Sequence, residues 1–166
     1  DCELSRGLGD VYKRQSDAVQ NLLSENVATE KIKNVGNIMI DTLVKNLDHI
    51  VSKENFDPAE FSLERDYFVL TLHRPINLTD NNLKIIFDAV SQFTKDYDIL
   101  IPAHPRLKDF VVKNNIDTKK FKVINPQPYI KFLGLVNNST LCLTDSGGLQ
   151  EETTFLNKKC LTLREE

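Results

Sequence analysis

The chain has 166 residues, of which 40% are hydrophobic and 27% are charged, and its net charge is -3. This length suffices for one domain with a buried core, and the composition is that of an ordinary globular protein. No cluster of Lys and Arg predicts nucleic-acid binding, and no apolar run reaches the ~20 residues that span a membrane or forms a signal peptide. We therefore expect a cytoplasmic protein with neither a nucleic-acid nor a membrane partner.

The cysteines and histidines do not form a pattern typical of metal sites. The three cysteines are Cys2, Cys142 and Cys160, and the last two fall in apolar segments that we expect to be interior strands. An odd count of this kind favours reduced, buried thiols over a disulfide or zinc framework. The three histidines are scattered and have no acidic residues at ligand spacing, so we expect no metal ion.

The first fifteen residues do not match the pattern of the rest of the chain. The run from Ser5 to Gln15 resembles a translated sequencing-library adapter joined to a genuine reading frame. We expect residues 1–15 to be a foreign scar and exclude them from the fold. On that interpretation residues 16–166 are one domain of a longer protein whose N-terminal part is missing.

From residue 16 onward, predicted helices and strands alternate. Helical spacing of apolar residues and candidate caps such as Asn37 and Thr79 mark the helices, and short apolar runs mark the strands. The expected helices cover residues 16–30, 38–51, about 107–111, 129–136 and 149–156. One more helix is expected to begin at Thr79 or Asp80, with Leu83, Ile86, Phe87, Val90 and Phe93 on its inner face. The expected strands are 67–72, 99–101, 121–124, 141–143 and 160–163.

This alternation predicts an α/β fold, a Rossmann-like parallel sheet with helices on both faces. Ligands of such sheets bind at the carboxyl ends of the strands. Polar residues follow four successive predicted strands: His73 and Arg74, then His104 and Arg106, then Gln127, then Ser146. We expect these side chains to line one rim of the sheet.

The stretch Thr144-Asp145-Ser146-Gly147-Gly148 lies between a predicted strand and a predicted helix. Such a turn directs free backbone N–H groups at one point, two glycines let a ligand come close, and the helix start favours negative charge. The stretch therefore predicts binding of the diphosphate of a nucleotide-linked substrate. The alternative is an ordinary turn in which Ser146 caps the helix.

Each of the other candidates also has a structural alternative. His73 and Arg74 are suited to phosphate contact or proton transfer, but His73 is equally well explained as a structural histidine at the end of a strand. His104 is better explained as part of a turn than as a site residue. A carboxylate at Glu151 or Glu152 fits ribose hydroxyls or favourable charge near a helix start. Phe132 fits stacking on a base or packing in the core.

Three familiar motifs are excluded. Asp145-Ser146-Gly147-Gly148 resembles the nucleophile segment of chymotrypsin-like proteases, but the flanking Thr144 and Leu149 and the alternating fold do not fit that family. Neither the Gly-x-Gly-x-x-Gly dinucleotide fingerprint nor a P-loop is present.

A set of short segments resembles the C-terminal half of the UDP-N-acetylglucosamine 2-epimerase family. In order and spacing these are Val35-Gly36-Asn37, Thr71-Leu72-His73-Arg74-Pro75 with Asn77, His104-Pro105, Leu143 to Glu152, and Leu161-Thr162-Leu163-Arg164-Glu165. The resemblance covers about residues 30–166, and the string from Thr144 to Glu152 is its most specific part.

This resemblance implies the C-terminal, UDP-binding domain of a glycosyltransferase-B type fold. The family interconverts UDP-N-acetylglucosamine and UDP-N-acetylmannosamine without a cofactor, by eliminating UDP and adding it back to a 2-acetamidoglucal. The resemblance also implies a homodimer. It implies that His73 is catalytic and contacts the phosphates of the departing UDP, and that Ser146, Gly147 and Gly148 bind the diphosphate. Glu152 would bind the ribose, Gln127 and Phe132 would border the uracil, and Arg74 and His104 would bind a second substrate molecule.

The chain also departs from the family pattern. Ile76 stands where the family usually has Glu, the chain stops before the family's Thr-Glu-Arg-Pro segment, and the implied acid/base carboxylates and Lys belong to an N-terminal domain. We therefore expect this chain to be inactive alone. The alternatives are a hydrolysing relative that releases UDP and N-acetylmannosamine, a non-catalytic nucleotide-binding domain, and a glycosyltransferase, which Gln150-Glu151-Glu152 disfavours.

Overall fold

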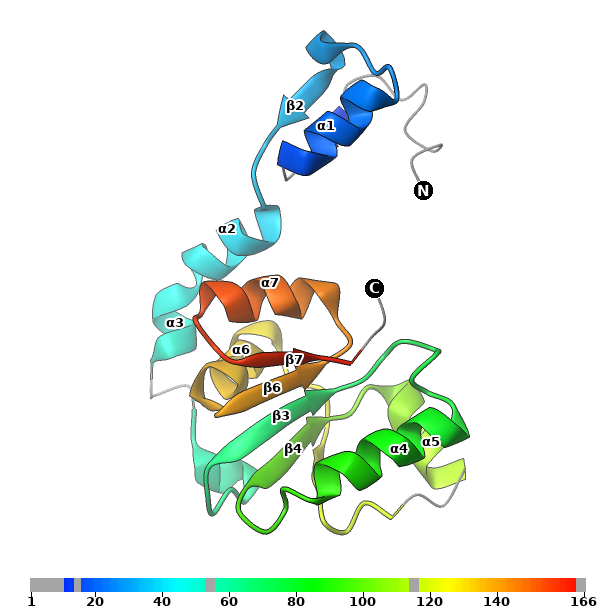
Figure 1. Ribbon diagram of the computed structural model, residues 1–166. Helices are drawn as coiled ribbons and strands as arrows, with labels where there is room; N and C mark the ends of the chain where they lie inside the picture. The colour runs from blue at the N-terminus through cyan, green and yellow to red at the C-terminus, as the bar shows by residue number, and fades with distance from the viewer. Residues whose placement is uncertain (1–10, 14–15, 53–55, 114–116, 164–166) are drawn as a thin grey trace. The chain divides into compact units, whose positions relative to one another are not determined.

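The computed structural model describes residues 11–13, 16–52, 56–113 and 117–163 (Figure 1). The chain forms two compact units, Asp1–Val44 and Lys45–Glu166, and each is described here by itself. The predicted boundary at residue 16 and the expectation of a scar over residues 1–15 stay predictions, and residues 1–10 and 14–15 lie outside the described residues.

The first unit is small. It contains β1 (Val11–Lys13), α1 (Ser16–Ser24), the 3-10 helix η2 (Thr29–Lys31), β2 (Ile32–Asn34) and most of α2 (Ile38–Lys45), and β1 pairs with β2 in parallel. The helix expected over residues 16–30 ends at Ser24. Asn37 caps α2 as predicted, because its Oδ1 accepts a hydrogen bond from the Met39 N–H at 3.1 Å.

The second unit carries the predicted alternation. Its elements are α3 (Leu47–Val51), the 3-10 helix η4 (Pro58–Phe61), β3 (Tyr67–Thr71), α4 (Asp80–Ser91), β4 (Asp98–Pro102), α5 (Pro105–Lys113), β5 (Lys122–Ile124), α6 (Tyr129–Asn138), β6 (Leu141–Thr144), α7 (Gly147–Phe155) and β7 (Cys160–Thr162).

Two further details of the predicted helices are wrong. The helix expected over residues 38–51 is divided into α2 and α3 at Asn46, whose φ of -110° and ψ of 8° are not helical. Asn is prone to this because its side chain competes with the helix for backbone hydrogen bonds. Phe93, expected on the inner face of α4, lies beyond the end of that helix and is 49% exposed, although its ring contacts Phe68.

The predicted parallel sheet is confirmed. Its strand order is β5-β4-β3-β6-β7, and every neighbouring pair is parallel (Figure 1). The central strand β3 is buried from Tyr67 to Leu70, as expected for a continuous apolar strand that is covered on both faces.

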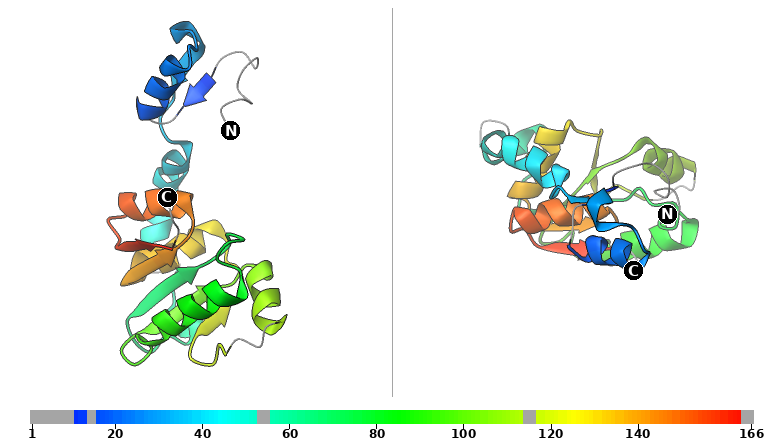
Figure 2. Two further views of the ribbon diagram at one scale, coloured as in Figure 1. Left: turned by 45° about the vertical axis from the view of Figure 1, so that its right-hand side comes forward. Right: turned by 90° about the horizontal axis from the view of Figure 1, so that it is seen from above.

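Helices pack on both faces of this sheet, also as predicted (Figure 2). Alternate residues of β3 and β4, among them Phe68, Leu70 and Ile101, form one core with α4 and α5. The residues between them face α6 and α7: the Tyr67 hydroxyl donates to the Leu135 carbonyl at 2.6 Å. None of the described helices is long and apolar enough to span a bilayer.

The strand order reverses beside the central strand. From β3 the chain moves outward through β4 to β5, then returns across the sheet to β6 and moves outward the other way to β7. β3 and β6 are therefore neighbours whose following segments diverge to opposite faces. Such a reversal opens a crevice at the carboxyl ends of the two strands, which is where α/β sheets bind ligands.

The two described cysteines are free thiols on neighbouring strands. Cys142 on β6 is buried and lies opposite Cys160 on β7. Because β7 is the last described strand of the sheet, Cys160 is only half-buried, and the expectation that both thiols are interior is wrong for it. The hydrogen bond with Cys142 lowers the pKa of Cys160 to about 6, while the same bond and burial raise the pKa of Cys142.

Leu70→Ala tests whether the face of the sheet under α4 and α5 carries the stability of the second unit. Leu70 is fully buried in the central strand, so its truncation should leave a cavity and lower the free energy of unfolding by roughly 2–5 kcal/mol. Urea unfolding followed by circular dichroism measures this. Ile85→Ala on α4 is the control, because Ile85 is 57% exposed and its truncation should change little; equal losses for the two variants would contradict the assignment.

Candidate functional site

A buried carboxylate joins the ends of the two strands at the switch point. Asp145 follows β6 and is fully buried. It accepts hydrogen bonds from the backbone N–H groups of His73 at 3.1 Å and Arg74 at 2.9 Å, and from the Asn77 side-chain amide at 3.0 Å. All three donors belong to the segment that follows β3. Asp145 therefore fixes the loop after β3 against the start of the turn after β6.

His73 also contacts Asp145 through its side chain. Its Nδ1 lies 2.7 Å from Asp145 Oδ1, while the side chain as a whole is half-exposed. A carboxylate on Nδ1 fixes the orientation of the ring and keeps a proton on that nitrogen. Nε2 is left as the nitrogen that can take up a proton and, once protonated, donate to a phosphate oxygen.

Arg74 is held over the same turn. Its Nε donates to the Asp145 backbone carbonyl at 2.8 Å, and the residue is half-buried. The fork of a guanidinium oriented through Nε is suited to an anion such as phosphate. The loop after β3 thus brings one imidazole and one guanidinium to the carboxyl end of β6.

Ser146 begins α7 as the predicted cap. Its Oγ accepts a hydrogen bond from the Leu149 N–H at 3.4 Å, and its own N–H donates to Thr144 Oγ1 at 3.0 Å. Gly147 and Gly148 form the first turn, where backbone N–H groups have no acceptor inside the helix. The turn thus combines the helix cap with N–H groups and the positive end of a helix dipole, all favourable to an anion.

No individual role was predicted for Thr71, Asn77, Thr144 or Asp145, although the last two lie in the stretch predicted to bind the diphosphate. Thr71 and Thr144, directly opposite on β3 and β6, share a hydrogen bond of 2.6 Å between hydroxyls. Asn77 also donates to the Leu163 carbonyl at 2.7 Å, beyond the end of β7. These four residues lie inside or beside the segments that carry the family resemblance, which is the sequence feature that could have identified them. Their contacts could not be predicted, because they join segments far apart in the sequence.

Glu152 lies on α7 and is only 6% exposed. Its Oε1 accepts a hydrogen bond from the Tyr129 hydroxyl, the first residue of α6, at 3.0 Å. Burial raises the pKa of Glu152 and the neighbouring Glu151 raises it further, whereas the Tyr129 bond lowers it. Tyr129 is a second functional candidate that the sequence did not reveal.

The other predicted site residues lie outside the Asp145 contacts. His104 is exposed, and its Nδ1 accepts from the Arg106 N–H at 3.3 Å in the first turn of α5, in agreement with the turn alternative. The Gln127 amide donates to the Asn125 carbonyl at 2.9 Å, and Phe132 is half-buried on α6. The structure thus gathers His73, Arg74, Ser146, Gly147 and Gly148 at the switch point, while Glu152 pairs with Tyr129 between α6 and α7.

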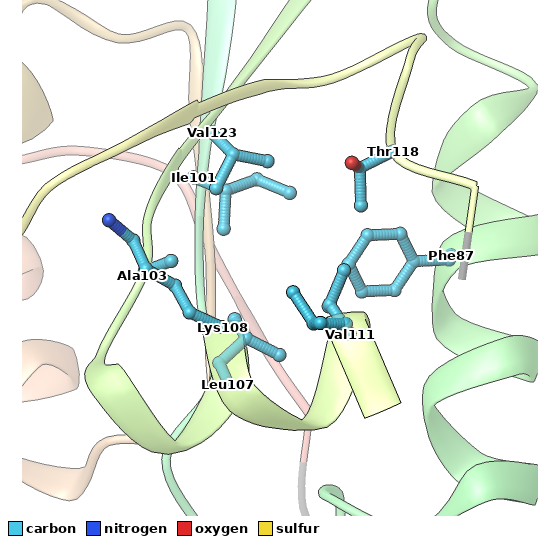
Figure 3. A pocket seen from close by; sticks show the side chains of 9 residues that line it. Phe87, Ile101, Ala103, Leu107, Lys108, Val111, Thr118 and Val123 are labelled. Carbon is cyan, nitrogen blue, oxygen red and sulfur yellow. The ribbon is translucent and has the colours of Figure 1, made fainter. Parts of the chain in front are cut away.

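An apolar cavity of about 220 Å³ lies elsewhere in the unit (Figure 3). It is bordered mainly by α4, α5, β4 and β5. Lys108 and Thr118 are the polar residues on a wall otherwise formed by Phe87, Ile101, Ala103, Leu107, Val111, Val112 and Val123. Lys108 Nζ bonds to Asn125 Oδ1. A wall of this composition does not suit an anion, so we do not assign it to the site. Among the described residues no group of three or more His, Cys, Asp or Glu could hold a metal ion.

Asp145→Asn tests the role of the buried carboxylate. The amide would keep the shape but turn an NH2 group toward backbone donors, so we expect unfolding to become easier by about 2–4 kcal/mol. Urea unfolding measures the loss, and NMR of the imidazole nitrogens should show that the His73 Nδ1 proton is no longer held. Asp88→Asn, an exposed change on α4, is the matched control. A stability and an imidazole spectrum equal to those of the parent would contradict the assignment.

Comparison with known proteins places these residues in a family. The family model described as UDP-N-acetylglucosamine 2-epimerase matches residues 13–166. A protein of that name from Methanococcus maripaludis is 39% identical over an alignment of 161 residues that covers 89% of this chain and 43% of the relative. A namesake from Methanocaldococcus jannaschii is also 39% identical, over 158 residues, with the same coverage of each chain.

Solved structures agree. The crystal structure of the Methanocaldococcus jannaschii UDP-GlcNAc 2-epimerase in complex with UDP-GlcNAc and UDP superposes with a TM-score of 0.83 and 36% identity, over 95% of this chain and 46% of that one. The chain spans less than half the length of the relatives it matches. The parallel sheet and the glycosyltransferase-B type relatives confirm the predicted fold class, and the chain belongs to the UDP-N-acetylglucosamine 2-epimerase family.

Proposed function

We propose that residues 16–166 form the UDP-binding half of an enzyme that interconverts UDP-N-acetylglucosamine and UDP-N-acetylmannosamine in the cytoplasm. The observation that carries this proposal is the Asp145 cluster, which holds His73 and Arg74 beside the start of α7 at the switch point of the sheet. Further support comes from the relative whose crystal structure contains UDP-GlcNAc and UDP.

The diphosphate would lie over the start of α7. There it would accept hydrogen bonds from the N–H groups of Gly147 and Gly148 and from the Ser146 hydroxyl, beside the Arg74 guanidinium. The lack of side chains at the two glycines would let the phosphates approach the backbone closely. His73 would use Nε2, the nitrogen that Asp145 does not hold, to contact the phosphate oxygens.

The nucleoside would lie toward α6. Glu152 would accept hydrogen bonds from the ribose, and Gln127 and Phe132 would border the uracil. The position of His104 at the exposed start of α5 leaves it open to a second substrate molecule, the role that the family resemblance implies.

In the proposed reaction the bond between the anomeric carbon and the diphosphate oxygen breaks, and the proton at C2 is removed, which gives UDP and 2-acetamidoglucal. UDP then adds back to the anomeric carbon while a proton is delivered to the opposite face of C2, which gives the epimer. His73 would stabilise the charge that develops on the departing diphosphate. The groups that move the C2 proton would lie in the other half of the enzyme. We expect the whole enzyme to act as a homodimer.

Gly148→Val tests the diphosphate site. A branched side chain in the first turn of α7 would fill the space above the backbone N–H groups, so UDP should bind at least about tenfold more weakly. NMR titration suits the weak binding expected of one half of a cleft, and uridine serves as the probe without phosphates. Thr154→Val, an exposed change near the end of α7, should leave the UDP affinity unchanged. Equal affinity of the Gly148 variant and the parent for UDP would contradict the assignment of the diphosphate site to the start of α7.

Turnover by this chain alone tests the division of the enzyme into two halves. Because the proton-transfer groups are proposed to lie in the other half, the chain should form no N-acetylmannosamine product from UDP-N-acetylglucosamine, and a protein with both halves should. Proton and phosphorus NMR of the mixture separates UDP-N-acetylmannosamine from free N-acetylmannosamine with UDP, and so separates epimerisation from hydrolysis. Sustained turnover by this chain would contradict the proposal.

A further inference from the structure

The bond between Tyr129 and Glu152 joins two helices at the ligand end of the sheet. Tyr129 is the first residue of α6, and Glu152 lies on α7, which begins at Gly147. Both helices follow strands of the same parallel sheet and pack on the same face, so both begin near the carboxyl edge where the site lies. The Tyr129 hydroxyl reaches across to Glu152 Oε1 at 3.0 Å.

The two partners differ in exposure. Glu152 is 6% exposed, whereas Tyr129 is 38% exposed at the surface of the site. Among the residues that the structure describes, the Tyr129 hydroxyl donates a hydrogen bond to the Glu152 carboxylate. An ionised carboxylate can accept about four hydrogen bonds, so one Tyr donor leaves most of that capacity unused.

We infer that Tyr129 is a positioning residue for ribose recognition, which holds Oε1 of Glu152 so that the carboxylate accepts the vicinal hydroxyls of a nucleoside diphosphate. The inference rests on the proposed function, since it deepens the role given to Glu152. A vicinal diol offers two donors side by side, and a carboxylate held in one orientation is a matching acceptor.

The place of Tyr129 in the sequence supports this role. It lies two residues after Gln127 and three before Phe132, the residues proposed to border the base. One turn of α6 would therefore connect the base and the ribose. Burial and the Glu152 bond raise the pKa of Tyr129 to about 12, so the hydroxyl remains a donor at any working pH.

The charge of Glu152 depends on few neighbours. Burial raises its pKa, the Tyr129 bond lowers it, and Glu151 on the same helix raises it. The strands packed against α7 are β6 and β7, whose titratable groups are Cys142 and Cys160, and the α7 residue that hydrogen-bonds Cys160 is Thr153. Loss of the Tyr129 hydroxyl should therefore raise the pKa of Glu152 further.

Tyr129→Phe tests the inference with UDP and 2′-deoxy-UDP as probes. The parent should prefer UDP, and the variant should lose about fivefold of that preference, because the carboxylate is no longer held toward the ribose. Tyr97→Phe is the matched control: Tyr97 stacks on Phe68 just before β4, at the opposite end of the sheet, so its variant should keep the preference of the parent.

The pH profile separates positioning from a purely structural bond. A group with a raised pKa loses its charge as the pH falls, so UDP affinity of the parent should fall on the acid side, and in the Tyr129 variant this fall should move to higher pH. Carbon NMR of the Glu152 carboxyl, in the full chain without ligand, should show the same upward move. An unchanged Glu152 titration, or unchanged probe preference and pH profile, would overturn the inference.

The same measurements distinguish this inference from the function on which it rests. If the parent chain shows no UDP binding, both fall. If the parent binds UDP but the Tyr129 variant keeps the preference for UDP over 2′-deoxy-UDP, only the role of Tyr129 falls. A loss of unfolding stability in the variant without these changes counts against the inference, because a bond that merely joins α6 to α7 would produce it.

Discussion

The site depends on one buried charge. A carboxylate such as Asp145, removed from water, is stable only where donors replace the lost hydration. Here the donors come from the loop after β3: two backbone N–H groups, the Asn77 amide and the His73 imidazole. Because leaving any of them unpaired is costly, the loop has little freedom to move away from β6. The same contacts that satisfy the charge therefore also fix the side chains that face the crevice.

The topology makes this arrangement possible. His73 and Asp145 are 72 residues apart, yet β3 and β6 lie side by side because the chain reverses its direction across the sheet between them. The segments after these strands diverge to opposite faces and leave room above the strand ends. Arg74 and the start of α7 enter that room from its two sides. A tight turn after either strand would have closed the space above the strand ends, and an unanchored loop would have filled that space.

Sequence patterns predicted the layers and the rim but not their connections. The apolar runs from Tyr67 to Leu72 and from Leu141 to Leu143 were sufficient for parallel strands, because burial on both faces leaves a continuous apolar signal. The break at Asn46 lies in its backbone conformation and the pairing of Tyr129 with Glu152 in a side-chain hydrogen bond, and periodicity records neither. His104 is the opposite case: the sequence favoured a place in a turn, and its Nδ1 accepts the Arg106 N–H in the first turn of α5.

The contrast between the two buried carboxylates separates support from recognition. Asp145 receives several donors, among them two backbone N–H groups that cannot turn away, so its acceptor capacity is used within the protein. Glu152 is 6% exposed, and its hydrogen-bond donor among the described residues is one tyrosine that is itself 38% exposed. Hydroxyl groups of a ligand would add donors to this carboxylate, in keeping with the ribose role proposed for Glu152.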